Sequence, residues 1–222
     1  VRIAAAAAAA AAKAARAAAP TASCVVDLDF QDLMDERGLR SIAQQLMFSY
    51  AANRRVNAPL QLHFTSFGGA IRDDLEFRSL GYERWDVRMH TESYLQVFPR
   101  ERLVYLSSEA DEILETIDPE CVYVIGGLVD HNRYKGLCQS RAQMAAVRSV
   151  RLPIDEHMQM SQRRVLAVNH VVEILVEVAQ DGDWPRALEK VLPLRRGASL
   201  REGGTAGVIG EPVPDQAVEP SC

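Results

Sequence analysis

The chain lacks any uncharged apolar run of the roughly 18 residues that a membrane-spanning helix needs. Its alanine-rich start, residues 1–19, is only weakly hydrophobic and is interrupted by Lys13 and Arg16. It also lacks the apolar centre and flanks of a secretory signal. We therefore expect a protein that neither spans nor binds a membrane.

Metal-site and phosphate-loop signatures are missing as well. The four cysteines, Cys24, Cys121, Cys138 and Cys222, include no CxxC pair and no histidines at zinc-site spacing. Neither GxGxxG nor GxxxxGK[ST] occurs, and the segment LDFQDLM after the first expected strand contains no glycine. We expect no metal, reduced thiols in a nuclear or cytoplasmic protein, and no Rossmann-type oxidoreductase.

A net charge of −5 argues, at first sight, against a nucleic-acid partner. The charge is unevenly spread, however, and clusters at separate turns can form one basic surface after folding. The cationic clusters are Arg54–Arg55, Arg133–Lys135, Arg148–Arg151, Arg163–Arg164 and Arg195–Arg196.

Strand and helix patterns alternate from Cys24 onward, which predicts an α/β fold with a mainly parallel, doubly wound sheet. The expected strands are Cys24–Phe30, Leu60–Ser66, Trp85–Met89, Arg102–Ser107, Cys121–Ile125 and Val150–Leu152. The expected helices are Glu36–Arg55, Glu92–Phe98, Glu109–Ile117, Gly136–Val147 and Arg163–Ala179. We expect the domain to span residues 21–198, and the Gly/Pro/Glu-rich segment 199–222 to be a disordered tail.

The segment Val122–Lys135 carries the strongest functional signal. An apolar strand ends at Gly126–Gly127, and an acid, a histidine and two cations follow within a few residues. Paired glycines let a backbone approach a ligand closely, and ligands bind at strand ends in open α/β sheets. From spacing alone, a ligand site and an ordinary tight strand-to-helix turn remain alternatives.

Six segments, in this order along about Cys24–Ala198, resemble a known family. They are SIAQQLMFSYAANRR, TSFGG, VYVIGGLVDHNRYKG, RLPI, RRVLAVNHVVEIL and DWPRALEKVLPLRRGA. They are similar to the tRNA methyltransferases that modify N1 of the purine at position nine. That family belongs to the SPOUT superfamily, and the HNRYKG continuation resembles its nuclear/cytosolic guanine-specific branch.

The resemblance implies a C-terminal trefoil knot, S-adenosylmethionine as cofactor, tRNA as partner and a monomeric enzyme. It assigns chemistry to Asp130, which follows the GGLV motif and would accept or manage the guanine N1 proton. The alternative for Asp130 is a cap on the following helix.

Three loops would hold the cofactor according to the same resemblance. Their residues are Leu106, Ser107, Gly126, Gly127, Asp130, His131, Asn132, Arg133, Tyr134, Cys138, Leu152, Ile154, Arg164, Val165 and Leu166. Phosphate contacts with RNA are expected from Arg54, Arg55, Arg133, Lys135, Arg163, Arg195 and Arg196. The alternative for these cations is a solvated surface.

Residues 1–20 are predicted to form an alanine-rich helix. Family members usually carry a basic helix at this place, so the alanines can also stand for unidentified side chains of a basic RNA-binding extension. A second function stays open: an RNA-binding protein that keeps a knotted SPOUT fold without catalysis.

Overall fold

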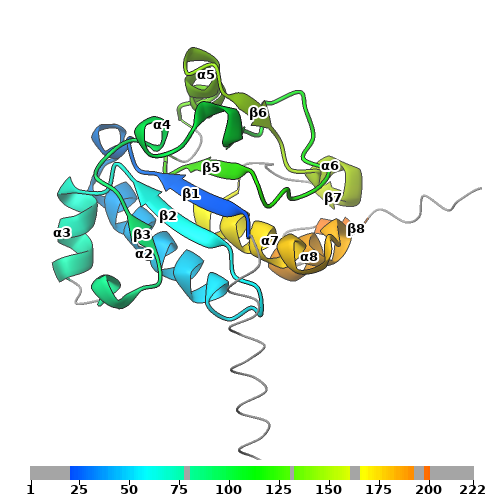
Figure 1. Ribbon diagram of the computed structural model, residues 1–222, viewed down its shortest axis with the longest axis horizontal. Coiled ribbons are helices and arrows are strands. Elements are labelled where there is room, and N and C mark those ends of the chain that lie inside the picture. Colours follow the sequence, from blue (N-terminus) through cyan, green and yellow to red (C-terminus); the bar gives the residue numbers. More distant parts are fainter. Residues whose placement is uncertain (1–20, 78–80, 131–132, 161–165, 193–197, 201–222) are drawn as a thin grey trace, which may run out of the picture.

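A six-stranded, wholly parallel sheet forms the centre of the chain (Figure 1). The computed structural model describes residues 21–77, 81–130, 133–160, 166–192 and 198–200. The strands are β1 (Ser23–Asp27), β2 (Gln61–Thr65), β3 (Arg88–Met89), β4 (Leu103–Leu106), β5 (Val122–Gly126) and β6 (Arg148–Val150). Their order in the sheet is β3-β2-β1-β5-β4-β6, so β1 pairs with β2 and β5 at the centre.

Helices cover both faces of this sheet, which confirms the predicted doubly wound α/β class. One face carries α2 (Glu36–Asn53), α3 (Gly69–Phe77), α7 (Val168–Asp181) and α8 (Trp184–Val191). The other carries α4 (Tyr94–Val97) and α5 (Leu137–Met144). Single helical turns are η1 (Gln31–Leu33), η2 (Tyr82–Arg84), η3 (Arg100–Arg102) and α6 (Ile154–His157).

The residues of β1 suit its position in the middle of the sheet. All five of its residues are buried, and alternate side chains face opposite layers: Val25 packs under α4 and α5, whereas Cys24 and Val26 pack towards α2 and α7. A strand buried on both faces is a continuous apolar run rather than an alternating pattern. The three central residues, Cys24, Val25 and Val26, fit that requirement, and the buried polar residues Ser23 and Asp27 lie at the two ends of the strand.

The helix predicted at Glu109–Ile117 is wrong. This stretch is irregular, with turns and bends, and Ile113 forms an isolated parallel bridge with Arg151 after β6. Leu114 N donates to Arg151 O, and the Trp184 indole donates to Glu115 O at 2.7 Å. These long-range partners satisfy the backbone better than an isolated short helix would, so tertiary contacts override the local propensity.

Other boundaries move by a few residues. Strand β6 ends at Val150, where the prediction began, and α7 begins at Val168 rather than Arg163. The predicted tail starts too early, because β8 (Ala198–Leu200) pairs antiparallel with β7 (Met158–Met160). Residues 1–20 and 201–222 lie outside the described residues.

The predicted trefoil knot depends on the path of residues 161–165, which are outside the described part of the chain. The knot therefore stays a prediction. Within the described residues, no helix combines the length and apolarity that crossing a bilayer requires.

Buried His63 on β2 contacts half-buried His90, which follows β3. His63 is 2% exposed, and its Nδ1 lies 3.1 Å from Nε2 of His90. Burial, His90 and Arg88 together lower the pKa of His63 to about 4. The folded protein therefore keeps this imidazole neutral at pH values where the unfolded chain protonates it.

We expect the free energy of unfolding to fall as the pH drops from about 6.5 towards 4, because the unfolded chain takes up a proton that folded His63 does not. Above pH 6.5 neither state is protonated, so this contribution is constant. Urea unfolding at several pH values measures the slope, which reaches about 1.4 kcal/mol per pH unit for one proton. His63→Gln should flatten it, and equal slopes in both proteins would contradict the assignment.

Candidate active site

A cleft opens at the carboxyl ends of β4, β5 and β6, where parallel strands present their following loops. Its walls come from the loop after β4, the β5–α5 connection, the segment after β6 and the start of α7. The lining residues are Leu106, Ser107, Ser108, Glu109, Ile125, Gly126, Leu128, Asp130, Tyr134, Lys135, Gly136, Leu137, Cys138, Arg151, Leu152, Ile154, Asp155, Leu166, Val168 and Val171.

The structure brings most of the predicted cofactor residues to this one cleft. They are Leu106, Ser107, Gly126, Asp130, Tyr134, Cys138, Leu152, Ile154 and Leu166. Gly127 and Arg133 are described but do not line it. His131, Asn132, Arg164 and Val165 lie outside the described residues.

The two glycines after β5 have different roles. A Cβ at Gly126 would lie 2.6 Å from Cys138 Sγ and 3.4 Å from Phe30 Cζ, so the cleft wall packs directly on this residue. A Cβ at Gly127 would lie 2.6 Å from Asp27 O, to which the Gly127 amide donates at 2.7 Å. The lack of a side chain at Gly127 therefore lets its backbone pack against β1, whereas Gly126 lines the cleft.

Asp130 closes the turn that leads into α5. Its Oδ2 accepts from the Tyr134 amide at 2.7 Å, and its carbonyl accepts from the Arg133 amide at 3.1 Å. The capping role proposed as the alternative is thus present, although it closes the turn before α5 rather than the helix itself. The half-buried side chain also lines the cleft, so capping and ligand contact are compatible.

Sequence reasoning missed several lining residues, notably Glu109, Arg151 and Asp155. Glu109 and Asp155 add carboxylates to a wall that is otherwise largely apolar, whereas Arg151 is held by a two-point ion pair with Glu156. Their position just after β4 and β6 was a usable signal, because residues following parallel strands meet at one edge.

A buried carboxylate behind the cleft was also missed. Asp27 ends β1 opposite Gly126 and is 1% exposed. Its Oδ1 accepts from the Asp29 amide, and Arg141 Nη1 lies 3.6 Å from its Oδ2. Burial raises the pKa of Asp27 to about 6, while the Asp29 amide and Arg141 oppose that rise. The sequence feature that could have marked Asp27 as a candidate site residue is its place at the end of an apolar strand.

The described cations do not form one patch. Lys135 is at the cleft and exposed Arg133 is close to it in sequence, but Arg54 and Arg55 follow the far end of α2. That helix runs about 27 Å back from the carboxyl edge of the sheet at 1.5 Å per residue. Arg148 is ion-paired with Glu112. Arg163, Arg195 and Arg196 lie outside the described residues.

No group of three or more His, Cys, Asp or Glu side chains among the described residues is arranged to hold a metal ion. The described cysteines, Cys24, Cys121 and Cys138, are free thiols. Burial raises the pKa of Cys138 to about 11, so this cleft residue is a protonated thiol at neutral pH.

Comparison with known proteins identifies the family. A family model described as tRNA (guanine(9)-N(1))-methyltransferase TRM10/TRM10A matches residues 4–197. The chain belongs to this family. The resemblance predicted from the six sequence segments is therefore confirmed.

Relatives within the TRM10/TRM10A family support the same assignment. The tRNA (guanine(9)-N(1))-methyltransferase Trmt10A of Drosophila melanogaster is 41% identical over 182 residues, covering 81% of this chain and 57% of that protein. The tRNA (guanine(9)-N1)-methyltransferase of Schizosaccharomyces pombe is 38% identical over 181 residues, covering 80% and 60%. The chain thus spans little more than half the length of these curated relatives.

Solved TRM10 structures share the fold. A crystal structure of full-length spTrm10 in complex with SAH has a TM-score of 0.74 and 36% identity, covering 79% of this chain and 95% of that one. A dual-specific Trm10 from Thermococcus kodakaraensis, at 18% identity and a TM-score of 0.60, is alike in fold alone.

Proposed function

We propose that this protein transfers a methyl group from S-adenosylmethionine to N1 of guanine nine in tRNA. The observation that carries the proposal is the cleft at the ends of β4, β5 and β6, in which Asp130 meets the predicted cofactor residues. The names of the relatives and the SAH bound to spTrm10 support it.

The residues of the cleft fit the cofactor. Apolar side chains such as Leu106, Leu152 and Leu166 offer flat surfaces for an adenine ring. The carboxylates of Glu109, Asp130 and Asp155 suit a ligand with a sulfonium and an ammonium group. When bound, S-adenosylmethionine supplies an electrophilic methyl group, and no metal is needed for that chemistry.

Asp130 manages the proton in this proposal. Guanine N1 carries a proton at neutral pH, and a carboxylate within hydrogen-bond reach can accept it or orient the base. The Tyr134 amide fixes Oδ2 of Asp130 at 2.7 Å, which limits the rotation of the carboxylate at the cleft wall. A purine in a folded tRNA must leave its stack to reach this side chain.

Two measurements test the proposal. Calorimetry with S-adenosylhomocysteine should show one binding site, and mass spectrometry of a tRNA incubated with protein and cofactor should find N1-methylguanosine at position nine. A tRNA carrying adenine nine is the matched substrate control. RNA binding without cofactor binding would favour the alternative, a non-catalytic RNA-binding protein.

RNA affinity is proposed to depend on phosphate contacts, with Lys135 the best placed of the described cations. Lys135 is exposed and lines the cleft. We expect Lys135→Ala to weaken binding to all tRNA substrates alike, because a phosphate contact reads no base. The log–log dependence of affinity on salt should become shallower by about 0.7–0.9, as measured by filter binding.

Arg84→Ala is a matched control for that experiment, since Arg84 is an exposed cation in η2 on the opposite side of the sheet from β4 and β6. A Lys135→Ala protein with unchanged tRNA affinity and salt slope would leave Lys135 a solvated side chain.

The enzyme is proposed to act as a monomer. Within the described residues, the large exposed hydrophobic side chains are Phe48, Leu95 and Met144, and they lie on three different helices. Scattered apolar side chains are ordinary on monomers and do not make a continuous interface. Light scattering coupled to size exclusion tests this, and a mass of two chains would contradict it.

A further inference from the structure

Helix α5 directs two side chains towards the end of β1. Cys138 and Arg141 lie three residues apart, on one side of the helix. Cys138 lines the cleft and packs against Gly126. Arg141 instead reaches the segment that follows β1: its Nη1 lies 2.8 Å from Asp29 Oδ2, and its Nη2 donates to Asp29 O at 2.6 Å.

Phe30 connects Arg141 to the cleft wall. The guanidinium carbon of Arg141 lies 3.9 Å from the centroid of the Phe30 ring. The far edge of that ring lies 3.4 Å from the position a Cβ would take on Gly126. Phe30 therefore lies between Arg141 and Gly126, and Gly126 lines the cleft.

We propose that Arg141 is a positioning residue, which clamps α5 to the end of β1 and thereby holds the Gly126–Cys138 wall in the shape that binds the adenosyl cofactor. This inference rests on the proposed function. An arginine suits the role because its planar fork can donate to a side-chain and a main-chain oxygen while stacking on a ring.

Asp27 links the clamp to pH. Its buried carboxylate faces Asp29 from the β1 exit, Arg141 and Cys138 from α5, Tyr94 from α4 and Tyr105 from β4. The pKa of Asp27 is about 6, so the carboxylate is ionised above that pH and attracts Arg141. As the pH falls through 6, the charge is lost and the clamp loses one of its two acidic partners.

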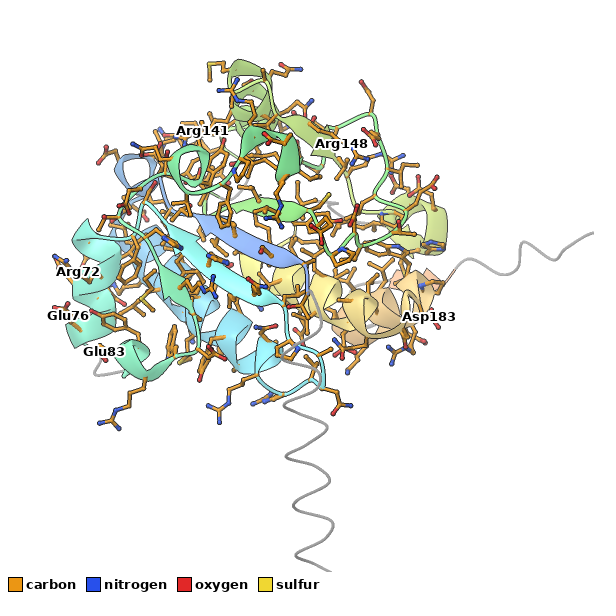
Figure 2. The ribbon with its side chains drawn as sticks, in the orientation of Figure 1. Arg72, Glu76, Glu83, Arg141, Arg148 and Asp183 are labelled. Carbon is orange, nitrogen blue, oxygen red and sulfur yellow. The ribbon has the colours of Figure 1, made fainter. Side chains whose placement is uncertain are left out.

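The experiment compares Arg141→Met and Arg141→Lys with the unmodified protein, using S-adenosylhomocysteine affinity by calorimetry from pH 5.5 to 8. Arg72→Met is the matched control, because Arg72 also pairs with an acid but lies on α3, well apart from Arg141 (Figure 2). A melting curve of each variant reports folding, and filter binding reports tRNA affinity.

Arg141→Met should lose about 10- to 100-fold in cofactor affinity, because small displacements of binding groups cause losses of this size. Arg141→Lys should lose less, because it keeps the charge without the planar fork. The affinity of the unmodified protein should fall as the pH drops through 6, whereas Arg141→Met should lack this pH dependence, because Asp27 then has no cation to attract. Asp27→Asn should bind weakly at every pH, and Arg72→Met should match the unmodified protein.

A folded Arg141→Met protein with unchanged cofactor affinity and unchanged pH dependence would overturn the inference. If that variant does not fold, Arg141→Lys decides: a normal melting curve with unchanged cofactor affinity overturns the inference equally. An unmodified protein without cofactor affinity is a different result, because it refutes the proposed function itself.

Discussion

Replacing Asp130 with Asn should slow methyl transfer by about 10²- to 10⁴-fold, the usual contribution of a general base. Asn keeps the size of the side chain and can still accept the hydrogen bond from the Tyr134 amide. The turn should therefore survive while the basicity is lost. Single-turnover assays with saturating cofactor isolate the chemical step from binding and product release.

Asp183→Asn is the matched control. Asp183 is the N-cap of α8 and accepts from the Arg186 amide, and Asn caps a helix about as well as Asp. It should keep both rate and stability. The pH–rate curve adds a second criterion, since a general base gives a rising limb that Asp130→Asn should lack. A rate within a few-fold of the unmodified enzyme would reduce Asp130 to a residue that closes the turn.

Gly126→Val should remove cofactor binding and cost about 1–3 kcal/mol of stability through overpacking. A branched side chain at this place meets Cys138 Sγ at 2.6 Å and also projects beside the cleft. Calorimetry with S-adenosylhomocysteine measures the first effect, and urea unfolding measures the second. A folded Gly126→Val protein with unchanged cofactor affinity would exclude Gly126 from the binding site.

A double-mutant cycle separates the two causes. Gly126→Ala alone should be destabilised by the contact with Cys138, and Cys138→Ala removes the sulfur that it meets. If the pair regains both stability and cofactor affinity, the clash with Cys138 was the whole effect. If stability returns without affinity, the added methyl occupies space that the ligand needs.

Sequence patterns predicted the elements whose burial repeats regularly. The continuous apolar run Val122–Ile125 is typical of a buried strand, and the four-residue spacing of Ile42 and Leu46 is typical of one helix face. Strand β5 and helix α2 both appear where these patterns predict them. The loop residues around Gly126 followed from the family resemblance. A cleft at the ends of parallel strands then follows from topology.

The wrong or missing elements depend on distant partners. The residues of Glu109–Ile117 favour a helix locally, yet Arg151 and Trp184 supply their hydrogen bonds from far along the chain. Helix α8 was missed although Asp183 and Pro185 form an ordinary start signal. The burial of Asp27 needed the positions of α4 and α5, which no local pattern contains.

The order of strands also has a consequence for synthesis of the protein on the ribosome. Strand β1 is made early, but its neighbour β5 is made only after residues 28–121 have emerged. Until then, one edge of an apolar strand has no partner, and such edges promote association between chains. We therefore expect this edge of β1 to stay open to mispairing until Val122–Gly126 closes the sheet.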